Sequence, residues 1–553
     1  MPRHLPTFAP LPLREGEPAA QLRTSLTHIV ANSPPDQKPT SAGRGLYSGP
    51  LSLSYLFLRL DATHGGLEPA LHIKSRPLRH WSIAYLRQGL AAQEHYGTDA
   101  TLARNGIGSS ALAALALSAS ISGDEIAALS LCSYAETLTL AHHHQPSSSA
   151  APEAMETPPV PAPDWLSGLA GYLYLLRLVR TSSVFTHDTR LQREIRNAED
   201  ETIEALLAPH PSQQQQEQKR PRWCVARTRA GGVKKKNLAG HVYLGAVHGI
   251  AGILTQIVLS CPSRAEDVRG DLEDLLTAQL EDGNWPSHTS FSFSHSSPPV
   301  SSPSHSSQAP EENEKSENEI KDLIPSPTPA PTQTENDSDP NPNPDTIAEE
   351  NKGKDQDTDA SPQMHFSNGT PGILSSLLSL RPHYHDLHAA IDAAVARGRA
   401  RILEACHRDL LTKREGEGDP GLCHGITGIS LALPRGEMES LLALMLLTTT
   451  EATTEMEGKT RLMQQNKDNM VVTSTATTTT TTSSNSNSDD DDNHNDHDNR
   501  VSLWHGEGGR AWAWAIASFA ATTTTAAAAA EDADIEEEEE EADKIRVIGF
   551  NDI

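Results

Sequence analysis

Residues 245–257, GAVHGIAGILTQI, join a glycine-containing turn directly to a short apolar helix, and this junction recurs along the chain. The other instances lie at Gly49, Gly106, Gly168, Gly369, Gly425 and Gly506. The run after each turn is apolar around most of a helix circumference, which is typical of an inner layer packed on all sides. A unit that recurs at this scale predicts one repeat architecture for most of the 553 residues.

Longer amphipathic segments lie between the turns and are predicted as a second set of helices. They cover 81–90, 124–142, 193–207, 267–280, 385–410 and 437–447. Each repeat is therefore a helix pair, and no segment shows the sustained alternation of a strand. Such pairs can stack as an open solenoid with polar caps or close into a ring. Because the last repeat is as apolar as the others, we predict an all-α ring with its glycine turns at one end.

Low-complexity tracts interrupt this body and explain its low apolar fraction, 36%, and aromatic fraction, 4%. We expect disordered inserts at 146–163, 209–222, 287–362 and 448–499, because none has the apolar periodicity that offsets the entropy of ordering. The predicted organisation is an N-terminal extension with the first outer helix (1–44), the ring (45–521) and a tail (522–553). The tail is acidic and of low complexity, with a short apolar C-terminus.

Charge and cysteine content restrict the class of protein. Much of the net charge of −28 lies in acidic low-complexity runs, which disfavours a nucleic-acid partner, and the basic cluster at 219–236 is interpreted as a surface loop. Five scattered cysteines do not describe a disulfide framework. The N-terminus has no apolar leader, and no apolar window is long enough to span a bilayer. We expect a cytoplasmic monomer without integral membrane insertion; peripheral contact with the plasma membrane stays open.

Three turns carry side chains suited to chemistry. The sequence GLCHG at 421–425 places the Cys423 thiol and the His424 imidazole at a helix N-terminus, which favours a thiolate as metal ligand or nucleophile. A buried structural pair is the alternative. His248, between glycines in YLGAVHGIAGI, is a candidate general acid or base. Asp164, in DWLSGLAG, either orients a catalytic histidine or caps the helix.

These motifs, together with DGNWPS (282–287), HFSNGTPGIL (365–374) and SLWHGEGG (502–509), resemble eukaryotic members of the lanthionine synthetase C-like family in content and order. The resemblance implies a double-layered α/α toroid of seven helix-pair repeats, with seven inner and seven outer helices. It also implies zinc-assisted addition of a thiol, with glutathione the expected thiol, to dehydroamino-acid residues of a peptide or protein.

The resemblance assigns roles residue by residue. The zinc-binding Cys-His pair of the family falls on Cys423 and His424, its active-site histidine on His248, and the aspartate of its bacterial members on Asp164. The remaining zinc cysteine of the family falls on Ser367, whose hydroxyl is a poor zinc ligand beside a thiolate.

Two further departures concern the same part of the chain. Asn368 stands where the family has a histidine or tyrosine expected to protonate the enolate, and the upstream arginine is missing. A substitute zinc ligand is available in His505 or His365, since three protein ligands and one open position are usual for catalytic zinc.

Two hypotheses follow. The chain is either an enzyme of thiol addition with a degenerate metal site, or a non-catalytic protein that binds glutathione or peptide on the same toroid. Proteins of this kind are sometimes labelled abscisic acid receptors of the membrane, but the apolar segments are too short and glycine-broken to span a bilayer. A toroidal glycosidase is disfavoured because no pair of carboxylates lies on the turns.

Overall fold

The computed structural model describes residues 13–14, 16–38, 41, 43–64, 71–96, 105–143, 162–208, 223, 242–289, 364–412, 421–443, 446, 501–529 and 550–551. All of them belong to one of the two compact units of the chain. Most of the residues in the four predicted inserts, and most of the basic cluster at 219–236, lie outside the described residues.

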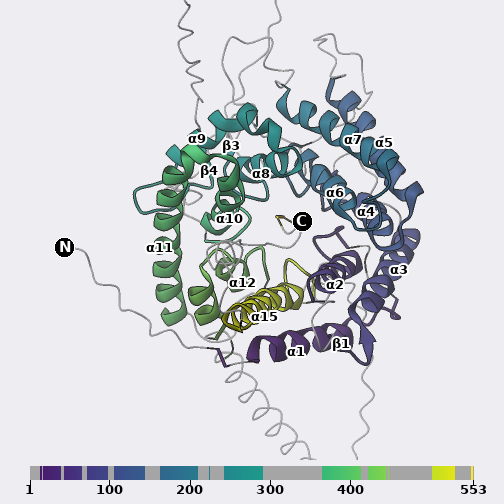
Figure 1. The fold of residues 1–553 in the computed structure, drawn as a ribbon, viewed down its shortest axis with the longest axis horizontal. Coiled ribbons are helices and arrows are strands. Elements are labelled where there is room, and N and C mark those ends of the chain that lie inside the picture. Colours follow the sequence, from purple (N-terminus) through teal and green to yellow (C-terminus); the bar gives the residue numbers. More distant parts are fainter. Residues whose placement is uncertain are drawn as a thin grey trace, which may run out of the picture. The chain divides into compact units, whose positions relative to one another are not determined.

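The inner helices follow the glycine turns, and they alternate in sequence with outer ones (Figure 1). They are α2 (Pro50–His64), α4 (Ser110–Ser122), α6 (Leu169–Thr181), α8 (Ile250–Ser260), α10 (Thr370–Leu380), α12 (Ile426–Ser430) and α15 (Glu507–Ala529). Each contacts the next in this order, and α15 returns to contact α2. The all-α prediction is confirmed, and the contacts of the inner helices close on themselves.

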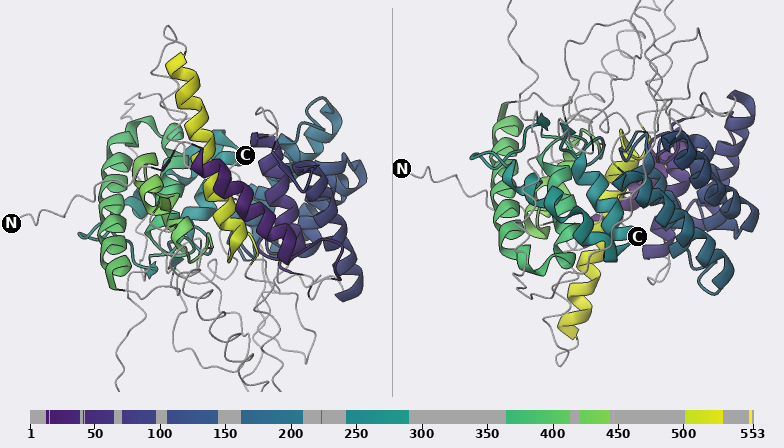
Figure 2. Two further views of the ribbon diagram at one scale, coloured as in Figure 1. Left: turned by 90° about the horizontal axis from the view of Figure 1, so that it is seen from below. Right: turned by 90° about the horizontal axis from the view of Figure 1, so that it is seen from above.

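The outer helices each cover an inner one. They are α1 (Glu17–Asn32), α3 (Leu78–Tyr96), α5 (Glu125–His143), α7 (Thr189–Leu207), α9 (Arg269–Thr277) and α11 (His388–Thr412). Short 3₁₀ turns, η2 (Pro262–Val268), η4 (Arg381–His383) and η5 (His385–Leu387), lead into α9 and α11, and residues 435–443 are also helical. The pairs in contact are α2 with α3, α4 with α5, α6 with α7, α8 with α9 and α10 with α11. Helix α1 packs on α15, so elements from the two ends of the chain lie together (Figure 2).

Two short antiparallel ribbons complete the described elements. Strands β1 (His72–Ile73) and β2 (Arg76–Pro77) pair His72 with Pro77, across a turn in which Lys74 and Ser75 have positive φ. Strands β3 (Val242–Tyr243) and β4 (His288–Thr289) pair Val242 with Thr289. No helix among the described residues is long and apolar enough to cross a membrane.

Two elements lie across boundaries predicted from composition. The insert predicted from residue 287 includes β4, whose backbone pairs with β3. The tail was predicted from residue 522, yet α15 continues to Ala529 through a Thr/Ala tract, since alanine is the strongest helix former.

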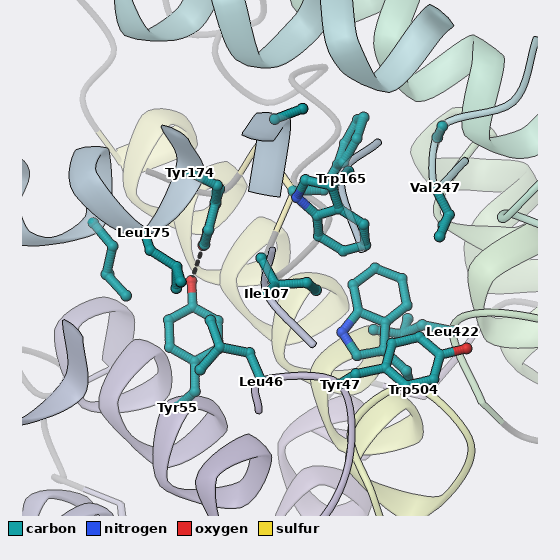
Figure 3. Packing of buried hydrophobic residues seen from close by; sticks show 14 of the residues in the cluster. Leu46, Tyr47, Tyr55, Ile107, Trp165, Tyr174, Leu175, Val247, Leu422 and Trp504 are labelled. Atoms are coloured by element: carbon teal, nitrogen blue, oxygen red, sulfur yellow. Dashed lines mark hydrogen bonds between the residues drawn. The ribbon is translucent and has the colours of Figure 1, made fainter. Parts of the chain in front are cut away.

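Backbone hydrogen bonds connect the glycine turns to one another. The donors and acceptors are Leu46 N–H to Ile107 O (2.8 Å), Ile107 to Trp165 (3.4 Å), Trp165 to Val247 (3.1 Å), Val247 to Ser367 (3.0 Å), Phe366 to Cys423 (3.0 Å) and Cys423 to Trp504 (2.9 Å). Beneath these turns the buried side chains of Tyr47, Trp165 and Trp504 pack together (Figure 3). The turns are therefore held in fixed positions relative to their neighbours, which is what a site assembled from several turns requires.

Candidate functional site

The candidate side chains occupy equivalent positions on successive turns. His248, Asn368, His424 and His505 each directly precede the glycine that leads into α8, α10, α12 or α15. The preceding position holds Val247, Ser367, Cys423 and Trp504, and in the first turn Tyr47. Because the helices are arranged side by side, equivalent turn positions come from different parts of the sequence to the same end of the inner layer.

The structure brings Asp164 and His248 together. Asp164 Oδ2 lies 3.5 Å from His248 Nδ1, while Asp164 Oδ1 accepts the backbone N–H of Ser167 at 2.6 Å. The backbone bond from Trp165 to Val247 fixes the two turns that carry them. Asp164 thus caps its own turn and faces the imidazole, but it does not cap α6, whose N-cap residue Gly168 has no side-chain hydrogen bond.

Cys423 has a partner that the motifs do not indicate. Its side chain is 1% exposed, and the hydroxyl of Tyr47 donates a hydrogen bond to its Sγ at 3.0 Å. The ring of Tyr47 lies parallel to that of Trp504 at 6.0 Å and edge-on to His505 at 4.7 Å. Sequence reasoning missed Tyr47, although its place two residues before Gly49 matches that of Cys423 before Gly425. That positional equivalence is the signal that could have found it.

Three imidazoles gather around His424, the residue that follows Cys423. The ring of His424 lies 4.6 Å from that of His365 and 6.0 Å from that of His505, nearly parallel to the latter. Both histidines that the sequence offered as substitute ligands therefore lie next to His424.

Ser367 is already engaged within its own turn. Its Oγ lies 2.7 Å from His365 Nδ1, and the backbone N–H of Asn368 points to the same nitrogen at 3.4 Å. Since an N–H can only donate, Nδ1 of His365 is an acceptor, and the Ser367 hydroxyl is the donor in their bond. Burial, followed by the neighbouring His424, lowers the pKa of His365 to about 4, so its ring is neutral near pH 7.

The shifted His365 predicts a pH dependence of stability. The folded-state pKa of His365, about 4, lies below the ordinary value of 6.5, so the folded protein binds this proton more weakly than the unfolded chain does. The contribution of His365 to stability is therefore complete above pH 6.5 and falls as the pH drops toward 4. Between pH 7 and pH 5 the wild type should lose about 1 kcal/mol more of its unfolding free energy than His365→Asn, after discounting for the half-buried ring. Urea denaturation of both proteins at the two pH values measures this; parallel losses would contradict the assignment.

These residues do not fit a catalytic zinc centre. Cys423 and His424 supply two ligands, whereas catalytic sites typically use three and an open position. The position of the family's third zinc ligand holds Ser367, whose hydroxyl is hydrogen-bonded to His365. Among the residues that the structure describes, no group of three or more His, Cys, Asp or Glu side chains is placed to hold a metal ion.

Comparison with known proteins adds one match. A family model described as lanthionine synthetase C-like protein matches residues 41–305. The matched segment contains Asp164 and His248 and ends before Ser367 and Cys423. No curated protein matches the chain. The similarity therefore covers the side of the site with Asp164 and His248 and not the side with the thiol and the clustered imidazoles.

Proposed function

This chain belongs to the lanthionine synthetase C-like family, and from that premise we propose that its turns bind a thiol and add it to dehydroamino-acid residues of a peptide or protein. Glutathione is the proposed thiol. The observation that supports the proposal is the contact between Asp164 Oδ2 and His248 Nδ1 at 3.5 Å, on the turns of the matched segment.

In the proposed reaction His248 takes the proton of the thiol as the sulfur attacks the β-carbon of the dehydro residue. The π electrons of the carbon–carbon double bond move toward the α-carbon and its carbonyl, which gives an enolate. His248 then returns a proton to the α-carbon. One S–C and one C–H bond form while the S–H and π bonds break, so no oxidant or reductant is needed. Asp164 faces Nδ1 of the imidazole and would keep the ring oriented.

Zinc content tests whether these turns hold a metal ion. Cys423 and His424 are the proposed ligand pair, and we expect the purified wild type to hold less than about one-tenth of an equivalent of zinc. Ser367→Cys should raise this toward one equivalent, because the side chain is 3% exposed and its backbone carbonyl is fixed by Val247, so a thiol would take the place of the hydroxyl.

Ser367→Ala is the matched control, since it removes the hydroxyl without adding a ligand. Near-stoichiometric zinc in the wild type would instead mean that His365 or His505 completes the site. The variants His365→Ala and His505→Ala would then identify which of the two does so.

A second function, binding without catalysis, is favoured by one specific observation. The two side chains at the family's cysteine positions both have protein partners: Tyr47 donates to Cys423, and Ser367 donates to His365. If the chain only binds, its Cys423→Ala variant should bind glutathione with the affinity of the wild type. The wild type should show no turnover with glutathione and a dehydroalanine peptide. Measurable turnover that is lost on replacing His248 would reject this alternative.

We also propose the setting in which the chain works. A cytoplasmic monomer would meet reduced glutathione, because the cytosol keeps thiols reduced. Its other partner would be a peptide or protein carrying the dehydro residue.

A further inference from the structure

Phe550, near the C-terminus, lies buried among the inner helices. Phe550 is 0% exposed, and its ring meets the rings of Trp165 and Phe366 edge-on, at 5.5 and 5.4 Å between centroids. Trp165 and Phe366 also contact Trp504, at 5.1 and 5.4 Å. Phe550 therefore completes an aromatic cluster contributed by three of the glycine turns.

Buried polar groups hold the backbone of the same residue. The carbonyl oxygen of Phe550 accepts hydrogen bonds from Gln256 Nε2 at 2.9 Å and from Arg177 Nη2 at 3.3 Å. Gln256 is 0% exposed and Arg177 1% exposed. The Arg177 guanidinium also donates to the side chains of Gln256 and Ser260. These donors also hold one another, and leaving them without the carbonyl would be costly in a buried position.

A third contact fixes the next residue. Asn551 Nδ2 donates to Ser379 Oγ at 2.6 Å. The two residues thus use side chains from α6, α8 and α10 in addition to the turns. Aromatic neighbours for the ring, two donors for its carbonyl and an acceptor for the side-chain amide of the following residue together constitute a site that recognises a short peptide segment.

We propose that this interior is a peptide-binding site and that its occupant is the chain's own C-terminal segment, acting as an intramolecular ligand with Phe550 as its anchor. The site lies behind the functional turns: Trp165 follows Asp164, and Phe366 joins His365 to Ser367. Occupancy supports the turns that carry these residues. The inference does not depend on thiol chemistry.

Binding in trans tests this proposal. The probe is a fluorescent peptide of residues 545–553, IRVIGFNDI, and the receptor is the full chain with Phe550→Ala. The peptide should bind this variant with a dissociation constant of about 1–100 µM, and the wild type at least about tenfold more weakly, because the tethered segment competes at high effective concentration. A peptide with alanine in place of its phenylalanine should bind the variant at least about tenfold more weakly.

Phe519→Ala is the matched control, since this phenylalanine is 42% exposed, and it should behave as the wild type. A folded Phe550→Ala protein that does not distinguish the two peptides would overturn the proposal. If that variant is insoluble, refolding it with the native peptide should restore soluble protein and refolding with the alanine peptide should not. Failure of the native peptide to rescue overturns the proposal equally.

Discussion

Replacing Gly252 by alanine is expected to destabilise the protein by about 3–5 kcal/mol, a large loss for one methyl group. A Cβ at this position, in the first turn of α8, would lie 1.8 Å from the carbonyl oxygen of Ala246. That oxygen belongs to backbone rather than to a flexible side chain, and Val247 beside it is hydrogen-bonded to the next turn. Relieving the clash between the added Cβ and this oxygen would require separating the turn from its helix.

Urea or thermal denaturation measures this effect, and the chain provides a matched control. Gly270 lies in α9 with nothing within 4 Å of an added Cβ, so Gly270→Ala should be neutral or stabilising by up to about 1 kcal/mol. The two substitutions are chemically identical and should differ in sign. If the Gly252→Ala and Gly270→Ala variants were equally stable, the turn before α8 would have to move easily, contrary to the hydrogen bonds that hold it.

Replacing His248 by glutamine is expected to lower thiol addition by about 10²–10⁴-fold, the range for loss of a positioned acid–base group. The variant should fold normally, because the side chain is 38% exposed and lies in a turn. The measurement is the initial rate of glutathione addition to a dehydroalanine peptide, followed by mass spectrometry. His187→Gln, at an exposed position between α6 and α7, is the control and should retain full activity.

The partnership with Asp164 makes this prediction more specific. Asp164→Asn keeps an oxygen for the Ser167 N–H but removes the charge that faces His248. We expect a smaller loss than for His248→Gln, and a double variant no worse than His248→Gln alone, since groups that act as a unit are not additive. Additive losses would assign Asp164 a role separate from the histidine.

Much of the fold could be predicted because its signals are local. Helix α8 begins at Ile250 directly after Gly249, and α10 at Thr370 directly after Gly369, as their glycine turns predict. A glycine and a run of apolar residues impose this geometry without help from distant parts of the chain. The positions of Asp164 and His248 on such turns follow in the same way.

Boundaries failed where composition was averaged over a segment. His288 and Thr289 resemble the polar tract that follows them, and only pairing with β3 makes them a strand. The predicted tail begins with threonines, yet α15 passes through them toward alanines that sustain it. In both places a neighbouring element, in space or along the helix, determines the structure.

The sequence by itself determined the all-α class, the glycine turns, and which candidate residues stand on them. The tertiary structure alone decided which of those residues meet. Tyr47 reaches Cys423 across 376 positions, and Arg177 reaches Phe550 across 373. Tyr47 stands on the first turn and Cys423 on the sixth, and the contacts of the inner helices from α12 through α15 back to α2 bring them together. Phe550 meets Arg177 because it lies buried among the inner helices. Closure depends on the packing of all the helices at once, so no local periodicity or spacing records it.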